Sequence, residues 1–290
     1  MKLIPWLAYW IHISPLPEAV KWVILYGCFP SKRYVVSVAS DFRLCVDVRD
    51  GLGCRIYRDK IWEPVLTTWF GRLCNSGMVV ADVGANIGFF SLLSAGLVGT
   101  RGRVYAFEPI SENVRLLRES VNLNGCHERI TIVPSAVSDR SGSVSMRTSR
   151  GVPSGGATTS KPRGGLRSSQ WVSKTVDVPS LTLDDYFDGL GINQVDLVKM
   201  DIEGGEVQAL KGMFRGLMRK RYRILMVEEH AQQDPSAPSE IRKILQHAGY
   251  HLYRFSGEDY LVPDQPGWGG YIIAFLEPPS QKWVFPISCG

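Results

Sequence analysis

The chain has 290 residues, of which 44% are hydrophobic and 21% charged, and its formal net charge is +5 at pH 7. This composition can bury a full hydrophobic core, which excludes an intrinsically disordered chain, and the length fits one large domain with an extension better than two equal domains. The six cysteines are scattered without a Cys-x-x-Cys pair, so the sequence predicts neither a zinc site nor a disulfide framework.

The first 30 residues are rich in aromatic and aliphatic side chains but are interrupted by prolines and charges. A membrane-spanning helix needs about 20 consecutive apolar residues, so we expect none here, and the features of a signal peptide are weak. Residues 3–30 predict a helical arm that packs on the main domain or on a second subunit. Their tryptophans leave peripheral contact with a membrane surface as the alternative. The predicted location is cytoplasmic, and the oligomeric state is not predicted.

Residues 34–57 alternate apolar and polar side chains, and Asp50-Gly51 is a hairpin-turn signal. They predict a small antiparallel unit able to wall a binding pocket. Residues 61–73 predict a helix whose buried face carries Trp62, Leu66, Trp69 and Phe70. The predicted organisation is an N-terminal extension, residues 1–75, followed by the main domain, residues 76–290.

The stretch 78–91 predicts a strand, a glycine loop and a helix. Apolar residues 78–81 predict a buried strand that ends at Asp82, and Gly84 and Gly88 then bracket a tight turn. Open α/β sheets bind ligands at the carboxyl ends of their strands, so this loop should face a cofactor. The alternative for Asp82 alone is an ordinary turn residue.

The loop differs from those that bind phosphates. The spacing is Gly84-x-Asn86-x-Gly88, without the Gly-x-Gly-x-x-Gly of dinucleotide folds or the Gly-Lys-Ser/Thr of phosphate-binding loops. An acidic residue before the loop suits a ligand that carries an ammonium and hydroxyls, such as S-adenosylmethionine. The next predicted strand, 103–107, leads to Glu108, where a carboxylate reaches ribose hydroxyls in such folds.

The rest of the chain continues the alternation of strands and helices. Helices are predicted at 111–124 and 238–248, and after Gly205 with Val207, Leu210, Phe214 and Leu217 as the buried stripe. Between two strands lies an insertion, 148–170, whose Gly-, Ser-, Thr- and Arg-rich composition predicts a mobile segment, either a lid or plain disorder. The predicted strands are 129–133, 143–147, 173–178, 195–201, 223–229, 250–255 and 271–275.

Five motifs in order resemble the FkbM family of S-adenosylmethionine-dependent methyltransferases, over about residues 65–230. They are Asp82-Val-Gly84-Ala-Asn86-Ile-Gly88, Ala106-Phe-Glu108-Pro109, Ser135-Ala136-Val-Ser-Asp139, Ser180-Leu-Thr182-Leu-Asp184-Asp185 and Val198-Lys199-Met-Asp201-Ile-Glu203-Gly204-Gly205-Glu206.

The resemblance implies a class I methyltransferase fold, which is an α/β, Rossmann-like, seven-stranded and mostly parallel sheet with helices on both faces. It implies S-adenosyl-L-methionine as the methyl donor and, most often, O-methylation of a hydroxyl on a sugar, glycan or secondary metabolite. It places the end of the third strand, Ser135 and Ala136, against the adenine ring. Together with Asp82, Gly84, Asn86, Gly88, Glu108 and Asp201, these are the predicted cofactor-binding residues.

The acceptor should lie over the ends of the fourth and fifth predicted strands. There the sequence places Lys199, Asp201, Glu203, Glu228, Glu229 and His230. A sulfonium is an activated leaving group, so the protein must mainly orient the hydroxyl and accept its proton. His230 is the first candidate for the base and Asp201 the second, with Lys199 as the charge partner of the carboxylates.

A divalent metal is the alternative to a base. Asp201, Glu203 and Glu229 could hold Mg²⁺, which would polarise vicinal hydroxyls. Because Lys199 already neutralises this cluster in part, no metal is predicted.

Two other functions remain as alternatives. The basic runs 140–174 and 211–223 could serve an RNA methyltransferase, although such runs are usually solvated faces and no nucleic-acid partner is predicted. The chain could also be a cofactor-binding scaffold without turnover.

Overall fold

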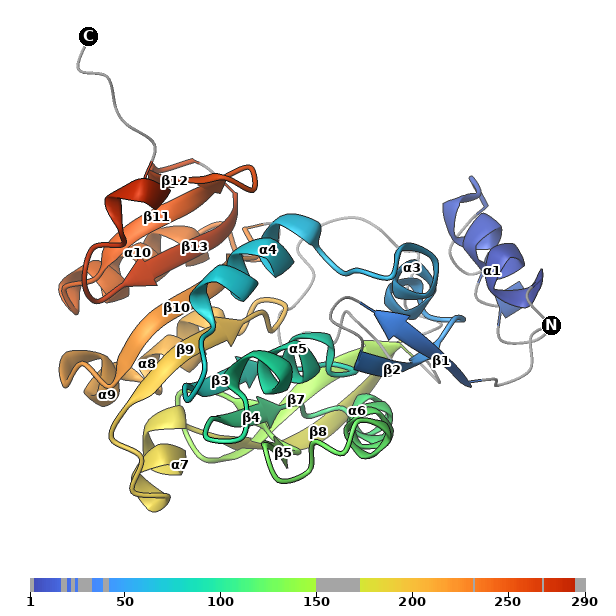
Figure 1. Ribbon diagram of the computed structural model, residues 1–290, viewed down its shortest axis with the longest axis horizontal. Coiled ribbons are helices and arrows are strands. Elements are labelled where there is room, and N and C mark those ends of the chain that lie inside the picture. The colour runs from blue at the N-terminus through green and yellow to red at the C-terminus, as the bar shows by residue number, and fades with distance from the viewer. Residues whose placement is uncertain are drawn as a thin grey trace, which may run out of the picture.

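The computed structural model describes residues 3–16, 20–21, 24–25, 33–38, 42–149, 173–231, 233–267 and 269–284. Residues 150–170 of the predicted insertion lie outside these ranges, while Thr148 and Ser149 end a strand. Figure 1 shows the N-terminal elements at one end of the molecule and the C-terminal strands at the other.

A large mixed sheet forms the centre of the protein. In the part of the chain that the structure describes it has eight strands, in the order β12 (Tyr260–Pro263), β11 (His251–Ser256), β13 (Gly270–Phe275), β10 (Tyr222–Glu229), β9 (Val195–Met200), β3 (Val79–Val83), β4 (Arg103–Phe107), β5 (Ile130–Val133). The strands β10, β9, β3, β4 and β5 are parallel, whereas the pairs β10–β13, β13–β11 and β11–β12 are antiparallel. The predicted mostly parallel sheet is confirmed, with β12 as an additional edge strand.

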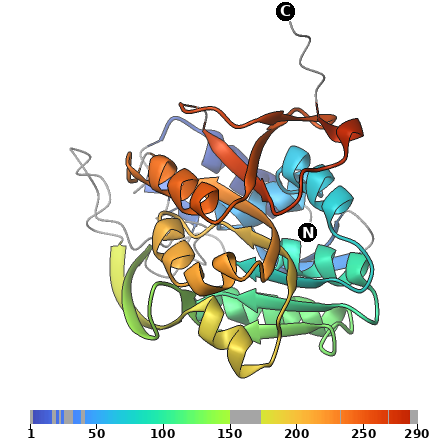
Figure 2. The ribbon, with the colours of Figure 1, turned by 90° about the vertical axis from the view of Figure 1, so that its left-hand side faces the viewer.

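Helices cover both faces of this sheet, because successive strand residues point to opposite sides. Val80 and Leu197 belong to one core cluster and their neighbours Ala81 and Val198 to the other. The first cluster includes α4 (Pro64–Leu73), α5 (Phe89–Val98) and α6 (Ser111–Leu123). The second includes α7 (Leu183–Gly189), α8 (Glu206–Lys211), α9 (Phe214–Met218) and α10 (Ala237–His247). In Figure 2 the orange helices α8–α10 and the cyan helix α4 lie on opposite sides.

The predicted helix after Gly205 is two short helices, α8 and α9. The first helix ends at Gly212, where a Cβ atom would lie 2.0 Å from the carbonyl oxygen of Ser138, so no side chain fits there. The change of helical phase buries Val207, Leu210 and Leu217 but turns Phe214 outward, where it is 42% exposed and stacks on His247. The prediction that Phe214 is buried was therefore wrong.

The N-terminal extension contains α1 (Leu3–Ile13), the hairpin of β1 (Arg33–Val38) and β2 (Phe42–Asp47), and α3 (Gly51–Asp59). The antiparallel unit is confirmed, but Asp50-Gly51 is not its turn. Asp50 is the N-cap of α3, and its carboxylate accepts a hydrogen bond from the Gly53 amide at 3.3 Å. An Asp-Gly pair fits a helix start as well as a hairpin, because aspartate is a favoured cap.

The predicted helical arm packs on α3. Ala8 is fully buried there, the Cys54 thiol donates to the Pro5 carbonyl at 3.7 Å, and Arg58 lies over the ring of Tyr9. No helix among the described residues is long and apolar enough to cross a membrane.

A second, smaller sheet lies beside the main one. It is formed by β6 (Ala136–Val137), β8 (Ser173–Leu181) and β7 (Gly142–Ser149), in that order, and β7 and β8, the two strands predicted to flank the insertion, pair antiparallel. A short 3-10 helix, η2 (Gln281–Trp283), follows the last strand.

Glu229 does not join the predicted cluster of carboxylates. Because strand side chains alternate, Glu228 and Glu229 point to opposite sides of β10. The carboxylate of Glu229 is fully buried and pairs with Arg242, at 2.9 Å, and with Arg254. Asp264 completes this network by pairing with both arginines. Glu229 is therefore a structural residue.

We expect Glu229→Gln to lower the free energy of unfolding by about 3 kcal/mol, because it leaves two buried arginines with one carboxylate. Chemical denaturation measures this loss. Glu228→Gln is the matched control one residue earlier, on the half-exposed side of the same strand, and should change stability by less than about 1 kcal/mol. Equal effects of the two substitutions would contradict the assigned network.

Candidate functional site

A cavity of about 720 Å³ opens at the carboxyl ends of β3, β4, β9 and β10. The chain runs outward from β3 through β4 to β5 and later returns to build β9 and β10 on the other side of β3. Such a reversal leaves a crevice between the two neighbouring strand ends, which is where open α/β sheets bind ligands. The volume is in the range of small-molecule sites.

The glycine loop after β3 forms one wall. Gly84 and Asn86 line the cavity, and both have positive φ, 80° and 51°. A Cβ atom on Gly84 would lie 1.9 Å from the carbonyl oxygen of Asp201, so this position requires glycine. Gly88 is not part of the wall. It starts α5 with φ 96° and makes room for the side chain of Leu117.

Glu108 faces the same end of the cavity. Its carboxylate accepts hydrogen bonds from the backbone amides of Asn86 and Ile110, both at 2.9 Å, and from the side-chain amide of Asn113 at 3.3 Å. Burial raises the pKa of Glu108 to about 7, against the lowering effect of these donors. The result is a fixed acceptor of hydrogen bonds at the tip of β4.

Asp82 lies behind this wall and does not line the cavity. It is fully buried, and its Oδ2 accepts a hydrogen bond from the Ser91 hydroxyl at 2.6 Å. Burial raises the pKa of its carboxyl group, while the ammonium of Lys199 opposes the shift. The last residues of β3 are buried on both faces of the sheet, so Asp82 points into the interior, contrary to the predicted ligand contact.

Ser135 and Ala136 line the cavity as predicted. Ser135 follows β5 and Ala136 begins β6 of the small sheet, and the apolar residues Ile110, Val137 and Met146 extend this part of the wall. This end of the cavity therefore combines an apolar surface with the carboxylate of Glu108.

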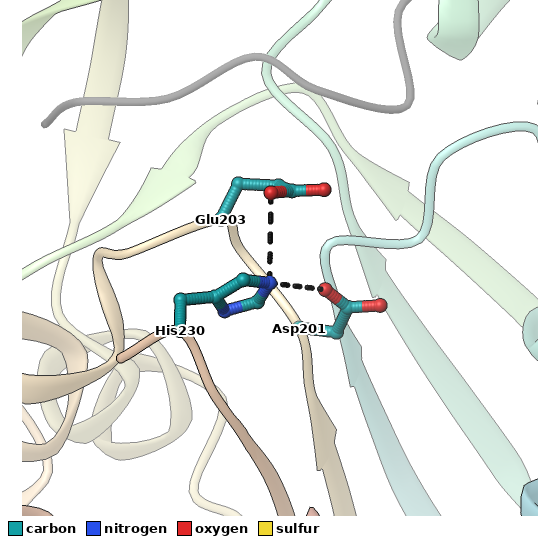
Figure 3. A group of neighbouring side chains, drawn as sticks. All are labelled: Asp201, Glu203 and His230. Carbon is teal, nitrogen blue, oxygen red and sulfur yellow. Dashed lines mark ion pairs between the residues drawn. The ribbon is translucent and has the colours of Figure 1, made fainter. Parts of the chain in front are cut away.

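The opposite end holds a cluster of carboxylates around His230, from the ends of β9 and β10. The Nε2 atom of His230 lies 3.5 Å from Glu203 Oε2, 3.7 Å from Glu228 Oε2 and 3.8 Å from Asp201 Oδ1. Figure 3 shows Asp201 and Glu203 converging on this nitrogen. The predicted convergence of Asp201, Glu203, Glu228 and His230 is thus what the structure shows.

Glu206 orients His230 from the other side. Its carboxylate lies 3.0 Å from His230 Nδ1 and accepts hydrogen bonds from the backbone amides of Ile202 and Gly204. Burial alone would lower the pKa of His230, but Glu206 and the surrounding carboxylates raise it to about 9. Burial and Asp201 raise the pKa of Glu228 to about 8.

Lys199 and Tyr271 hold the far oxygen of Asp201. The ammonium and the hydroxyl each lie 3.3 Å from Asp201 Oδ2, which leaves Oδ1 toward His230. Burial opposes the charge of Lys199, yet Asp201, Asp82 and Glu63 raise its pKa. Burial would raise the pKa of Asp201, but Lys199, Glu228 and His230 together lower it. Lys199 is therefore the charge partner that the sequence predicted.

Strained backbone gathers around the cavity. Among the described residues other than glycine, five have positive φ, and three of them, Glu63, Asn86 and Glu203, line it. Left-handed backbone in such residues costs free energy and tends to concentrate at functional sites.

Sequence reasoning gave no role to Glu206, Glu63 or Tyr271. Glu206 stands in the quoted motif after Gly205, so its position could have suggested one. Glu63 and Tyr271 come from the loop before α4 and from β13, and the hydroxyl of Tyr271 lies 3.4 Å from Glu63 Oε2. They are 208 residues apart, and no local pattern links them.

The sequence of this chain is similar to those of known enzymes. Over 151 residues the chain is 26% identical to the 2-O-methyltransferase NoeI of Sinorhizobium fredii, covering 50% of this chain and 60% of that protein. Over 172 residues it is 27% identical to the hexuronic acid methyltransferase AglP of Haloferax volcanii, covering 59% and 62%. The chain thus spans about 60% of the length of these relatives.

A solved structure, an S-adenosylmethionine-dependent O-methyltransferase from Thermotoga maritima, matches 87% of this chain and 80% of its own with 15% identity and a TM-score of 0.44. That likeness is too distant to bear on function. The family model described as "Methyltransferase FkbM domain" matches residues 82–252, which run from the end of β3 to the start of β11 and include most of the cavity wall. The chain belongs to the FkbM methyltransferase domain family.

Proposed function

We propose that the protein transfers a methyl group from S-adenosylmethionine to a hydroxyl oxygen of a sugar or another small polyhydroxylated acceptor. The observation that carries this proposal is that one cavity joins the Glu108 wall to the cluster around His230. Its volume, about 720 Å³, leaves room for a donor and an acceptor side by side.

The Glu108 end suits the donor. Its carboxylate can accept hydrogen bonds from ribose hydroxyls, and the apolar wall of Ile110, Ala136 and Val137 suits a purine ring. The loop from Val83 to Ile87 carries no lysine or arginine, which favours a ligand without phosphates. When bound, S-adenosylmethionine supplies a methyl group on a sulfonium, an activated leaving group.

The residues at the other end hold and orient the acceptor. Carboxylates at the ends of β9 and β10 can accept hydrogen bonds from several hydroxyls, which fixes the position of the reacting oxygen. Asp201 and His230 are the groups placed to take its proton, His230 only in its neutral form, because a pKa raised to about 9 keeps most of the imidazole charged at pH 7. Lys199 keeps Asp201 ionised and points its Oδ1 into the cavity.

A sugar acceptor is favoured by the relatives and by the cavity wall. One relative is named a hexuronic acid methyltransferase and the other a 2-O-methyltransferase. In this chain, Trp62 lines the acceptor end beside Glu63, and an aromatic face next to carboxylates suits a sugar ring. Transfer of radiolabelled methyl to fractionated glycans and metabolites tests the proposal, and no transfer to any fraction by donor-binding protein would favour a scaffold.

The second basic run, 211–223, gives little support to an RNA substrate. Arg221 is buried and pairs with Asp184 and Asp188, and Arg215 pairs with Asp185 at 2.5 Å. These cations are thus engaged within the protein.

Contact with a membrane surface stays a prediction. Helix α1 leaves Trp6, Leu7, Trp10 and Ile13 more than half exposed, and amphipathic aromatic side chains of this kind favour lipid interfaces. Sedimentation with lipid vesicles tests it.

Glu108→Ala should weaken donor binding about a hundredfold or more, because it removes a charged acceptor from two hydroxyls at about 1.5–3 kcal/mol each. Calorimetry with S-adenosylmethionine measures this. Glu112→Ala, in the exposed first turn of α6, is the matched control and should bind normally. Normal affinity of the Glu108 variant would sink the assigned donor end.

Donor affinity should rise with pH. The pKa of Glu108 is about 7 in the free protein, and the ionised carboxylate is the form that accepts from two hydroxyls. As the pH rises toward 7, the dissociation constant should therefore decrease about tenfold per pH unit, and above pH 8 it should level off. In Glu108→Gln it should lose this dependence. A flat profile for the unaltered protein would contradict the role of Glu108.

His230→Ala and Asp201→Ala should each reduce turnover by about a hundredfold or more while donor binding persists. His127→Ala, on an exposed turn, is the control and should retain full turnover. Full activity in both cavity variants would show that the acceptor end lies elsewhere.

A further inference from the structure

Four potential ligand atoms surround one point at the acceptor end. They are Nε2 of His230 and, at 3.5–3.8 Å from it, one oxygen each of Asp201, Glu203 and Glu228. In an octahedral site with bonds of about 2.1 Å, neighbouring ligand atoms lie about 3 Å apart and opposite ones about 4.2 Å apart. The ligand atoms of Asp201, Glu203 and His230 all lie within 4.8 Å of one another. The spacing suits a metal ion after small side-chain adjustments.

Each of these three side chains is held in place by a neighbouring group. Glu206 lies against His230 Nδ1, so Nε2 is the nitrogen left facing the cluster. Lys199 and Tyr271 hold Asp201 Oδ2, and Gln233 donates at 2.9 Å to Glu203 Oε2, the oxygen that faces His230. A carboxylate behind the histidine and hydrogen bonds to the ligating carboxylates are typical of metal centres.

The environment of Glu206 indicates independently that a positive charge is missing from this cluster. It is fully buried, its carboxylate is aimed at the imidazole of His230, and its Oε2 has no hydrogen-bond partner among the described residues. Among the described residues, four carboxylates thus surround the imidazole of His230, with the ammonium of Lys199 beside Asp201. A bound cation would balance this excess of negative charge.

We propose that Asp201, Glu203 and His230 bind a divalent cation. One imidazole nitrogen with carboxylate oxygens matches a first-row transition ion such as Mn²⁺ better than Mg²⁺, which prefers oxygen ligands alone. This differs from the set suggested by the sequence, because His230 takes the place of Glu229.

The role of the ion rests on the proposed methyl transfer, although its binding does not. The ion has open positions toward the cavity, where two adjacent hydroxyls of a sugar can bind it. There it lowers the pKa of the reacting hydroxyl. Glu228, whose carboxylate is left out of the three-residue set and lies 3.7 Å from His230 Nε2, takes the proton once it is ionised beside the cation. His230 then acts as a ligand and no longer as the base.

Binding of Mn²⁺ to chelator-treated protein, followed by electron paramagnetic resonance of the free ion, tests the proposal. We expect one saturable site per chain. Glu203→Gln and His230→Gln should each weaken it at least tenfold, whereas Glu128→Gln, an exposed residue, should leave it unchanged. No saturable binding of Mn²⁺ or Zn²⁺, or binding that survives both cavity substitutions, would overturn the site.

Two further measurements keep the test independent of variant folding and of turnover. In the unaltered protein, pulsed resonance of bound Mn²⁺ should detect one imidazole nitrogen, and its absence would overturn the assignment. Donor binding, measured by calorimetry, should persist without metal, because Glu108 lies at the other end of the cavity. Methyl transfer that continues undiminished in metal-free protein would refute the ion's role while leaving the methyltransferase proposal intact.

Discussion

The contact between the glycine loop and the end of β9 is the constraint on which the site depends. Gly84 approaches the carbonyl of Asp201 so closely that no side chain fits between them. Backbone hydrogen bonds join the ends of β3, β4 and β9. The amides of Gly84 and Ala85 donate to the carbonyl of Phe107, and the amide of Asp201 donates to the carbonyl of Val83. The two ends of the cavity are therefore set by main-chain geometry, and the side chains of Glu108 and Asp201 are carried by a rigid frame.

The two ends of the cavity differ in chemistry because they carry different buried charged groups. At one end, the carboxylate of Glu108 is held by neutral donors beside an apolar wall, so it can serve a neutral or cationic ligand. At the other end, His230 and Lys199 are embedded among carboxylates, and each holds the others in place. Burying so many charges is costly unless they are paired. Together with the left-handed backbone at Glu63 and Glu203, this cost indicates selection for function over stability.

The sequence predicts the elements that carry strong local signals. Apolar runs locate the strands of the main sheet, and the glycine spacing with Glu108 locates the cavity. The errors have physical causes. Asp50-Gly51 satisfies a helix cap as well as a turn, and the break at Gly212, which buries a glycine against Ser138, shifts the phase that Phe214 would follow. Contacts such as Tyr271 with Asp201 depend on how distant strands pair, which no local pattern contains.

Asp82 shows how a residue can matter to a site that it does not touch. Its carboxylate is sealed behind the loop with Ser91, yet it helps to raise the pKa of Lys199, which lies opposite it in the parallel register of β3 and β9. The ammonium held in this way binds Asp201 Oδ2 and turns Oδ1 toward His230. The acid that leads into the glycine loop therefore reaches the acceptor end through one buried cation. Its charge thereby acts from β3 on the neighbouring strand β9, at the point where the order of the strands reverses.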